Sequence, residues 1–123
     1  MNSPEILNEF PFQSLDLTID AKSTVCAVIV TYNPNIDDFS KLLEALLPQV
    51  AYAVVVDNSS SFDITSVIAR WSDQNVELLQ MRENVGIAAA QNAGIERALK
   101  LGADFVLLSD QDSVPSSSMV AEL

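Results

Sequence analysis

The feature that most constrains the fold of this chain is a set of four short apolar runs, each followed by polar residues. The runs are residues 25–30, 51–56, 76–81 and 105–108, and the third is the most mixed in composition. Apolar runs without polar alternation are typical of strands that are covered on both faces, as in parallel sheets flanked by helices. We therefore interpret these segments as strands of a buried parallel sheet.

The segments between the runs have helical periodicity. Helices are expected at residues 36–47, 62–71 and 87–101, with Asn35 as the N-cap of the first and Gly102 at the C-terminal end of the last. Strands that alternate with helices over short connections require a parallel sheet with right-handed crossovers. The predicted fold class is α/β, a Rossmann-like parallel sheet with flanking helices. In the last helix, the small residues Ala90, Ala93 and Gly94 predict a close approach to the sheet.

The chain has 123 residues, which is enough for one domain with a sizeable core. We interpret residues 1–23 as a leader with one short element at 15–19, and residues 24–123 as the domain. If the four strands, numbered along the chain, lie in the order 3-2-1-4 of a doubly wound sheet, the strand at 105–108 is left at an edge. An open apolar edge recruits other chains, so we expect a homodimer or larger assembly there, unless the leader folds over the edge and covers it.

Composition excludes several classes of function. A formal net charge of −11 repels nucleic acid and anionic lipid, and it disfavours a phosphorylated ligand unless a metal ion reverses the local field. With no histidine and one cysteine, Cys26, neither a zinc site nor a Ser-His or Cys-His pair is available. Cys26 is expected to be a buried packing residue. No apolar run approaches 18 residues and no signal-peptide pattern is present, so we expect a cytoplasmic location.

All four predicted strands end in polar residues. In open α/β sheets, ligands bind outside the carboxyl ends of the strands. We therefore expect a ligand site on one rim, built from the segments Thr31-Tyr32-Asn33, Asp57-Asn58-Ser59, Asn84-Val85-Gly86 and Asp110-Gln111-Asp112.

The last strand end carries two aspartates one residue apart. If the chain stays extended to Asp112, its carboxylate and that of Asp110 lie on one side, roughly 6.5 Å apart along the strand. Such a pair suits a divalent cation with a phosphate on its far side, because Mg²⁺ favours one or two carboxylates plus substrate phosphates. The alternative is a polar strand end with capping aspartates.

Other nucleotide-binding or phosphate-handling α/β proteins fit less well. A nicotinamide enzyme would carry G-x-G-x-x-G after the first strand, where this chain has Thr31-Tyr32-Asn33-Pro34-Asn35, and no P-loop is present. A phosphatase of the haloacid-dehalogenase type also carries Asp-x-Asp after an apolar strand. There the motif opens the fold, whereas here it lies close to the end of the chain.

Four motifs together resemble a family 2 glycosyltransferase, and the Asp-Gln-Asp-Ser form is most similar to its bacterial rhamnosyltransferases. The motifs occur in order between about residue 25 and Ser113. They are Val28-Ile29-Val30-Thr31-Tyr32-Asn33, Val55-Val56-Asp57-Asn58-Ser59, Asn84-Val85-Gly86 with Ala90-Gln91-Asn92-Ala93-Gly94, and Leu107-Leu108-Ser109-Asp110-Gln111-Asp112-Ser113.

The resemblance implies the nucleotide-sugar-binding half of a GT-A fold. Asp57 would accept a hydrogen bond from the base, Asp110 would lie near the ribose and the metal, and Asp112 would ligate Mn²⁺ or Mg²⁺ at the diphosphate. The remaining substrate-binding residues that it implies are Thr31, Tyr32, Asn33, Asn58, Asn84, Gly86 and Asn92.

The implied activity is inverting transfer of a sugar, with dTDP-rhamnose as donor, to a saccharide or lipid-linked acceptor in cell-surface polysaccharide synthesis. Family members carry a further acceptor-binding half with a carboxylate base, and Glu122 lies in no matching motif. We therefore expect this chain to be a fragment that transfers no sugar alone, from a parent enzyme at the inner face of the membrane. The alternative is a non-catalytic nucleotide-binding or interaction module.

Overall fold

A computed structural model describes residues 5–8 and 23–122 of the chain. The elements in chain order are β1 (Glu5–Asn8), β2 (Val25–Thr31), α1 (Ile36–Leu46), the 3₁₀ turn η1 (Leu47–Gln49), β3 (Tyr52–Asp57), α2 (Ile64–Ile68), the 3₁₀ turn η2 (Ala69–Trp71), β4 (Val76–Gln80), α3 (Ile87–Lys100), β5 (Phe105–Ser109) and α4 (Met119–Glu122).

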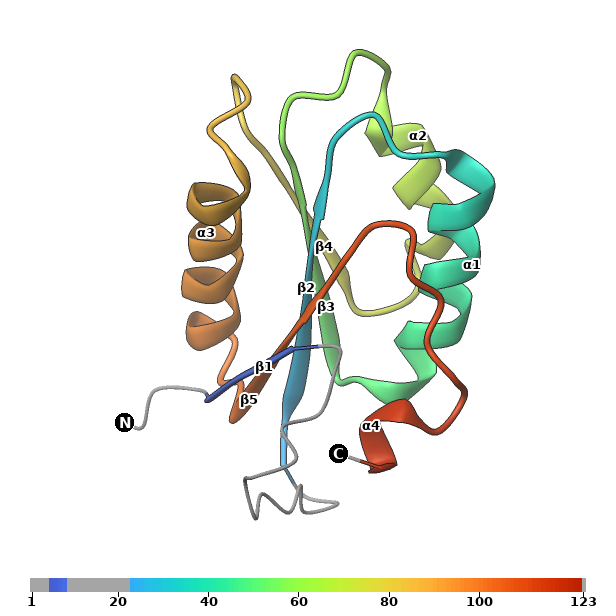
Figure 1. The fold of residues 1–123 in the computed structure, drawn as a ribbon, viewed down its shortest axis with the longest axis vertical. Coiled ribbons are helices and arrows are strands. Elements are labelled where there is room, and N and C mark those ends of the chain that lie inside the picture. Colours follow the sequence, from blue (N-terminus) through green and yellow to red (C-terminus); the bar gives the residue numbers. More distant parts are fainter. Residues whose placement is uncertain (1–4, 9–22, 123) are drawn as a thin grey trace.

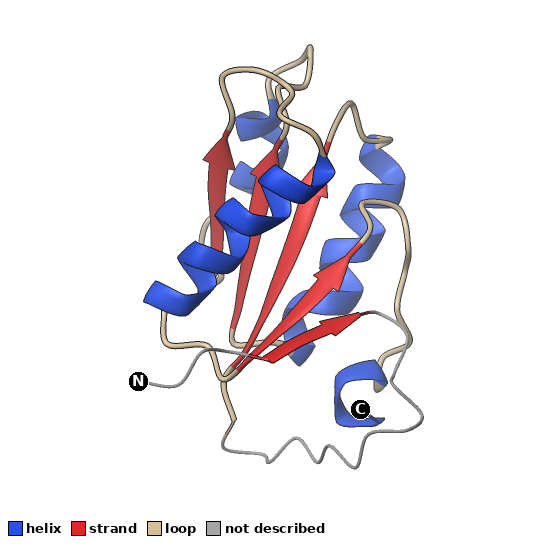
Figure 2. Ribbon diagram, turned by 60° about the vertical axis from the view of Figure 1, so that its left-hand side comes forward, coloured by secondary structure: helices blue, strands red, loops and turns tan. Residues whose placement is uncertain are grey.

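The strands form one five-stranded parallel sheet in the order β1-β5-β2-β3-β4. Helix α3 covers one face, and α1, α2 and α4 lie on the other (Figure 1). The arrowheads of Figure 2 point the same way, so the carboxyl ends of the strands meet along one rim. The predicted α/β class, with a parallel sheet between helices, is confirmed.

The core has two layers, one on each face of the sheet, because successive residues of a strand point to opposite sides. In β2, Ala27 and Ile29 pack with the larger cluster under α1 and α2, whereas Cys26 and Val28 pack with the cluster under α3. Burial raises the pKa of the Cys26 thiol to about 12, which keeps it neutral. Cys26 is therefore a buried packing residue, as predicted.

The boundaries of the helices follow local signals in the sequence. The side chain of Asn35 accepts a hydrogen bond from the backbone N–H of Asp38, which satisfies one of the free donors of the first turn of α1. Gly102 follows the C-terminal end of α3 and has a φ of +84°, a conformation that glycine adopts without a Cβ penalty. Both expectations from the sequence are confirmed.

One prediction about the sheet is wrong. The relative order of the four predicted strands is as expected, but β5 is not an edge strand, because β1 pairs with it in parallel from Glu5↔Phe105 to Asn8↔Leu108. Backbone groups that would have been open are thus paired by the N-terminal residues. This is the alternative arrangement, in which part of residues 1–23 covers the edge. Association with another copy of the chain stays a prediction, and the element predicted at 15–19 lies outside the described residues.

The close approach of α3 to the sheet is visible at Gly94. A Cβ built on this residue would lie 2.4 Å from Cγ1 of Val28 and 3.0 Å from Cγ2 of Val56. Real Cβ atoms essentially never approach another atom as closely as 2.4 Å, so only glycine allows α3 to lie at this depth. The prediction from the small residues of this helix is confirmed.

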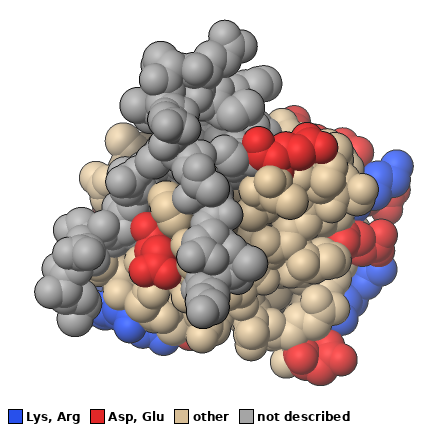
Figure 3. All heavy atoms as spheres, turned by 90° about the horizontal axis from the view of Figure 1, so that it is seen from below, with Lys and Arg blue, Asp and Glu red and all other residues tan. Residues whose placement is uncertain are grey.

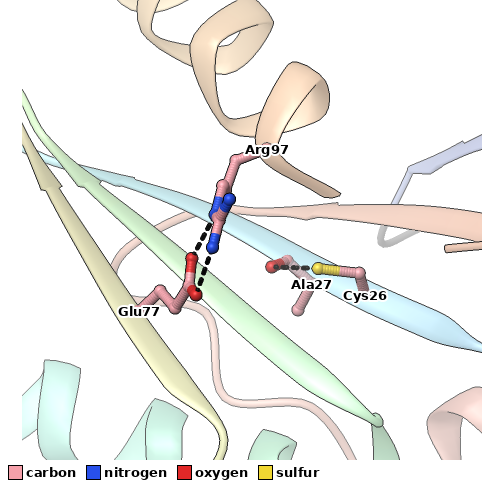
Figure 4. A network of polar contacts seen from close by, with 4 residues as sticks. All are labelled: Cys26, Ala27, Glu77 and Arg97. Atoms are coloured by element: carbon pink, nitrogen blue, oxygen red, sulfur yellow. Dashed lines mark hydrogen bonds and ion pairs between the residues drawn. The ribbon is translucent and has the colours of Figure 1, made fainter. Parts of the chain in front are cut away.

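Helix α3 is also tied to the edge strand β4 by an ion pair (Figure 4). The guanidinium of Arg97 donates to Glu77 through Nε at 2.5 Å and through Nη2 at 2.7 Å, in a two-point geometry. These hydrogen bonds lower the pKa of the Glu77 carboxyl below its ordinary value. More than a third of each side chain is exposed to solvent, so water and salt weaken the attraction.

The pair predicts a pH-dependent contribution to stability. Because the folded-state pKa of Glu77 is lowered, the stabilisation is present above the unfolded-state pKa and is lost as the pH falls through the folded-state value. We expect Arg97→Gln to lower the melting temperature slightly at pH 7. The difference from the unsubstituted chain should shrink as the carboxyl is protonated, in thermal melts followed by circular dichroism between pH 7 and pH 3. A difference that stays constant with pH would mean that Arg97 acts through packing of its alkyl stem.

Charged residues lie at separate places on the end of the molecule opposite the rim (Figure 3). Figure 3 shows the end opposite the rim, where the visible acidic groups lie at separate places and basic groups lie near some of them at the margin. Over the ranges 5–8 and 23–122, no helix is long and apolar enough to cross a membrane.

Candidate nucleotide-sugar site

A pocket of about 390 Å³ opens at the carboxyl ends of the strands. Its walls come from the ends of β2, β3 and β5, from the loop before α3, and from the first turns of that helix. The lining residues are Val30, Tyr32, Asn58, Asn84, Ile87, Gln91, Ser109, Asp110, Gln111 and Asp112. The ligand site expected on this rim is therefore matched by a cavity to which each of the four predicted rim segments contributes.

Asp57 and Thr31 lie on the same rim as the pocket but are not part of its lining. The Asp57 carboxylate accepts hydrogen bonds from Oγ1 of Thr31 at 2.7 Å, from the backbone N–H of Ser60 at 2.9 Å and from Oγ of Ser60 at 2.6 Å. Both Asp57 and Thr31 are buried, and neither lines the pocket. Asp57 thus joins the end of β2 to the turn after β3, and its contact with a base stays a prediction.

Asn33 also joins the end of β2 to the turn after β3 through hydrogen bonds. Its backbone N–H donates to Oγ of Ser60 at 2.9 Å, and its side-chain oxygen accepts from the N–H and the hydroxyl of Ser61. Asn33 has a φ of +44° and does not line the pocket. Tyr32 therefore lies between two residues, Thr31 and Asn33, that are hydrogen-bonded to Asp57 and Ser60. Tyr32 itself is 49% exposed and lines the pocket.

Two asparagines contribute to the pocket from the segments after β3 and β4. Asn58 is buried, and its side-chain oxygen accepts from the backbone N–H of Val85 at 2.9 Å, which ties the end of β3 to the loop after β4. The side-chain oxygen of Asn84 accepts from the N–H of Gly86 at 2.9 Å. Gly86 has a φ of +86°, and a Cβ there would meet no neighbouring atom, so its role is backbone geometry at the start of α3. Both asparagines line the pocket and Gly86 does not.

The first turns of α3 contribute Ile87 and Gln91 to the pocket, whereas the predicted Asn92 is exposed and lies outside its lining. Residues four apart lie on the same helix face. Gln91 follows Ile87 by four positions, and it shares with Gly94 the side that turns toward the sheet. This spacing was present in the sequence and would have favoured Gln91 over its neighbour.

At the end of β5 the backbone differs from the expected course. The strand ends at Ser109 and the chain turns at Gln111 and Asp112, so the extended path to Asp112 is wrong. Both aspartates nevertheless line the pocket, together with Ser109 and Gln111. Neither Ser109 nor Gln111 was assigned individually as a site residue, because an extended strand would have turned both away from the aspartates. Val30, which lines the pocket although it is an apolar strand residue, was also missed.

The pocket offers hard oxygen ligands but no complete metal cage. Within 5–8 and 23–122, no group of three or more His, Cys, Asp or Glu side chains could hold a metal ion. Asp110 and Asp112 supply two carboxylates on one wall. Mg²⁺ is commonly bound by one or two carboxylates with phosphate and water completing the shell, and carboxylate oxygen also suits Mn²⁺. The donor set therefore fits a cation that takes its other ligands from a diphosphate.

Fold and pocket together define a class of protein, an α/β domain with a pocket at the carboxyl edge of a parallel sheet. The model of the family described as glycosyl transferase family 2 matches residues 26–123. The chain belongs to this family.

Two curated relatives support the assignment. The chain is 39% identical over 101 residues to the dTDP-rhamnosyl transferase RfbF of Shigella flexneri, an alignment that covers 82% of this chain and 33% of the relative. It is 30% identical over 90 residues to the uncharacterized glycosyltransferase YwdF of Bacillus subtilis (strain 168), covering 72% of this chain and 32% of the relative. The chain thus aligns with about a third of the length of each relative.

Proposed function

We propose that this chain is the donor-binding part of a glycosyltransferase and that its pocket takes a nucleotide diphospho-sugar. The observation that carries the proposal is the pocket itself, in which two carboxylates from the end of β5 lie with Tyr32, Asn58 and Asn84 around one cavity. Its volume, about 390 Å³, lies within the usual range of small-molecule sites, about 300 to 1,000 Å³. Family membership supports the same ligand class.

The pocket lining contains two chemically different groups of residues. Tyr32 and Ile87 are both exposed large apolar side chains, suited to contact with the flat faces of a nucleoside. Asn58 and Asn84 add amide groups that can donate and accept hydrogen bonds. We assign the nucleoside to this part of the pocket and the diphosphate to the part lined by Asp110 and Asp112.

Asp112 and Asp110 would hold Mn²⁺ or Mg²⁺ between the protein and the diphosphate. When bound, such an ion acts as a Lewis acid that neutralises charge on the leaving diphosphate. It also answers the electrostatic objection, because a chain with a formal net charge of −11 repels a free nucleotide. The chain's own contribution is to orient the two carboxylates at one end of the pocket.

For the donor sugar we propose rhamnose carried by dTDP, because the relative from Shigella flexneri is named a dTDP-rhamnosyl transferase. We also propose inverting transfer to a saccharide or lipid-linked acceptor in polysaccharide synthesis, at the cytoplasmic side of the membrane, which the resemblance of the four motifs to family 2 glycosyltransferases implies. We assign no residue of this chain as the base that activates the acceptor.

Calorimetric titration of the chain with dTDP, UDP and GDP tests the donor assignment. We expect dTDP to bind most tightly and to bind more tightly in Mn²⁺ than in buffer with a chelator. Thymidine, which has no phosphate, should respond little to Mn²⁺. If none of the nucleotides binds in either buffer, the donor-site proposal is wrong and a non-catalytic interaction module becomes the better reading of this chain.

A further inference from the structure

Gln111, between the two aspartates, makes a two-point contact that the strand pattern did not suggest. Its side-chain Oε1 accepts a hydrogen bond from the backbone N–H of Tyr32 at 2.8 Å, and its Nε2 donates to the backbone oxygen of the same residue at 3.3 Å. The contact joins the segment after β5 to the segment after β2, two strands that are neighbours in the sheet.

The register of the sheet explains why a side chain is used here. The β2–β5 ladder ends at the pair Ile29↔Ser109, where β5 stops, although β2 continues to Thr31. The Gln111 side chain carries one donor and one acceptor, as a peptide group does. In an extended strand, the backbone of β5 itself would form hydrogen bonds with the main chain of Tyr32. Here the Gln111 side chain forms them instead, so the backbone of residues 110–112 can turn.

The two ends of this contact are held very differently. Tyr32 lies between Thr31, whose hydroxyl donates to Asp57, and Asn33, whose N–H donates to Ser60. Among the residues that the structure describes, the only hydrogen bonds from 110–115 to another part of the chain are the two made by Gln111. The turn that carries Asp110 and Asp112 is therefore hydrogen-bonded to the segment after β2 through the side chain of Gln111.

We propose that Gln111 is a positioning residue that holds the Asp110–Asp112 turn against Tyr32, and so sets the phosphate and metal end of the pocket relative to its nucleoside end. This inference rests on the proposed function of the pocket. Without the Gln111 amide, the neighbours of Tyr32 keep their hydrogen bonds to Asp57 and Ser60. The turn that carries both carboxylates, in contrast, loses its hydrogen bonds to Tyr32. The loss should therefore fall on diphosphate binding in Mn²⁺ and not on nucleoside binding.

Two variants separate the reach of the side chain from its polarity. Gln111→Met keeps the length and loses the amide, and Gln111→Asn keeps the amide and is one methylene shorter. The matched control is Gln80→Met, because Gln80 is an exposed glutamine of β4 that does not line the pocket. Thermal melts should show that all three variants fold, since Gln111 lies in a turn outside the core clusters.

The first measurement needs no ligand. Hydrogen exchange of the Tyr32 amide, followed by NMR, should become about tenfold faster in both Gln111 variants and stay unchanged in Gln80→Met, because a hydrogen bond of about 1.4 kcal/mol corresponds to a factor of ten. An unchanged rate in the two Gln111 variants would show that the amide does not hold Tyr32, and it would overturn the proposal.

The second measurement is the affinity for dTDP and for thymidine in Mn²⁺, by calorimetry. We expect both Gln111 variants to bind dTDP about tenfold more weakly and thymidine within about twofold of the unsubstituted chain. Unchanged dTDP affinity, or equal losses for the two ligands, would overturn the positioning role and leave the donor site intact. If the unsubstituted chain itself shows no Mn²⁺-dependent binding of dTDP, the proposed function fails, and this role fails with it.

Discussion

Asp112→Asn is expected to remove most of the affinity that Mn²⁺ adds for dTDP. The substitution keeps the size of the side chain and an oxygen that can accept a hydrogen bond, but it removes the negative charge that a divalent cation needs. Changes outside the ligand shell of a metal already cost about 10- to 100-fold in affinity, so a direct ligand should cost about 100-fold or more. Thymidine, which offers no phosphate, should bind the variant nearly as well as the unsubstituted chain.

Calorimetry with and without Mn²⁺ measures both ligands on the same protein. Asp73→Asn is the matched control, because Asp73 is an exposed carboxylate that precedes β4, at the opposite end of the sheet from the pocket. Equal losses for dTDP and thymidine in Asp112→Asn would indicate that the carboxylate supports the turn and not a metal. A similar loss in Asp73→Asn would indicate a general effect of net charge.

Gly94→Ala should destabilise the fold by about 1 to 3 kcal/mol, the usual cost of forcing an extra carbon atom into a packed core. Helix propensity alone predicts the opposite sign, because alanine is favoured over glycine in a helix by about 0.8 to 1 kcal/mol. Packing decides the sign here, since the added Cβ would lie 2.4 Å from Cγ1 of Val28 in a strand of the sheet centre. Either that valine or the whole helix has to move.

Urea unfolding at 25 °C measures the effect, with Asn92→Ala as the control. Asn92 is exposed on the same helix, so its replacement by alanine should be neutral or slightly stabilising. If Gly94→Ala is as stable as the unsubstituted chain, the helix can move away from the sheet at little cost. In either case we expect Gly94→Ala to bind the nucleoside more weakly, because a displaced α3 would carry Ile87 and Gln91 away from the pocket.

The interior strands and their flanking helices could be predicted because their signals are local. The runs that became β2 and β3 are apolar without alternation, and Asn35 and Gly102 mark helix boundaries through their own side chain or backbone. The short strand β1 lacks such a signal. It pairs with β5 through backbone groups, which every residue carries, so its composition said little about its place in the sheet.

The rim of the pocket was predictable at the level of segments and less so for single side chains. Parallel strands bring their carboxyl ends together, so Tyr32, Asn58, Asn84 and the two aspartates could be assigned to one site from their positions after apolar runs. Whether a rim side chain faces the cavity or braces the wall depends on which neighbour satisfies it. Asp57 and Asn33 have partners within the protein, and no pattern along the chain indicates those contacts.

The sequence by itself determined the fold class, the rim on which the pocket lies and the pair of carboxylates at the end of β5, because periodicity and strand ends are properties of consecutive residues. Only the tertiary structure decided that β1 covers β5, that β5 stops at Ser109 and that Gln111 bonds to the main chain of Tyr32. The pairing of β1 with β5 and the contact of Gln111 with Tyr32 join residues about 80 to 100 positions apart. Their energy comes from hydrogen bonds that form only after the sheet has brought both partners together.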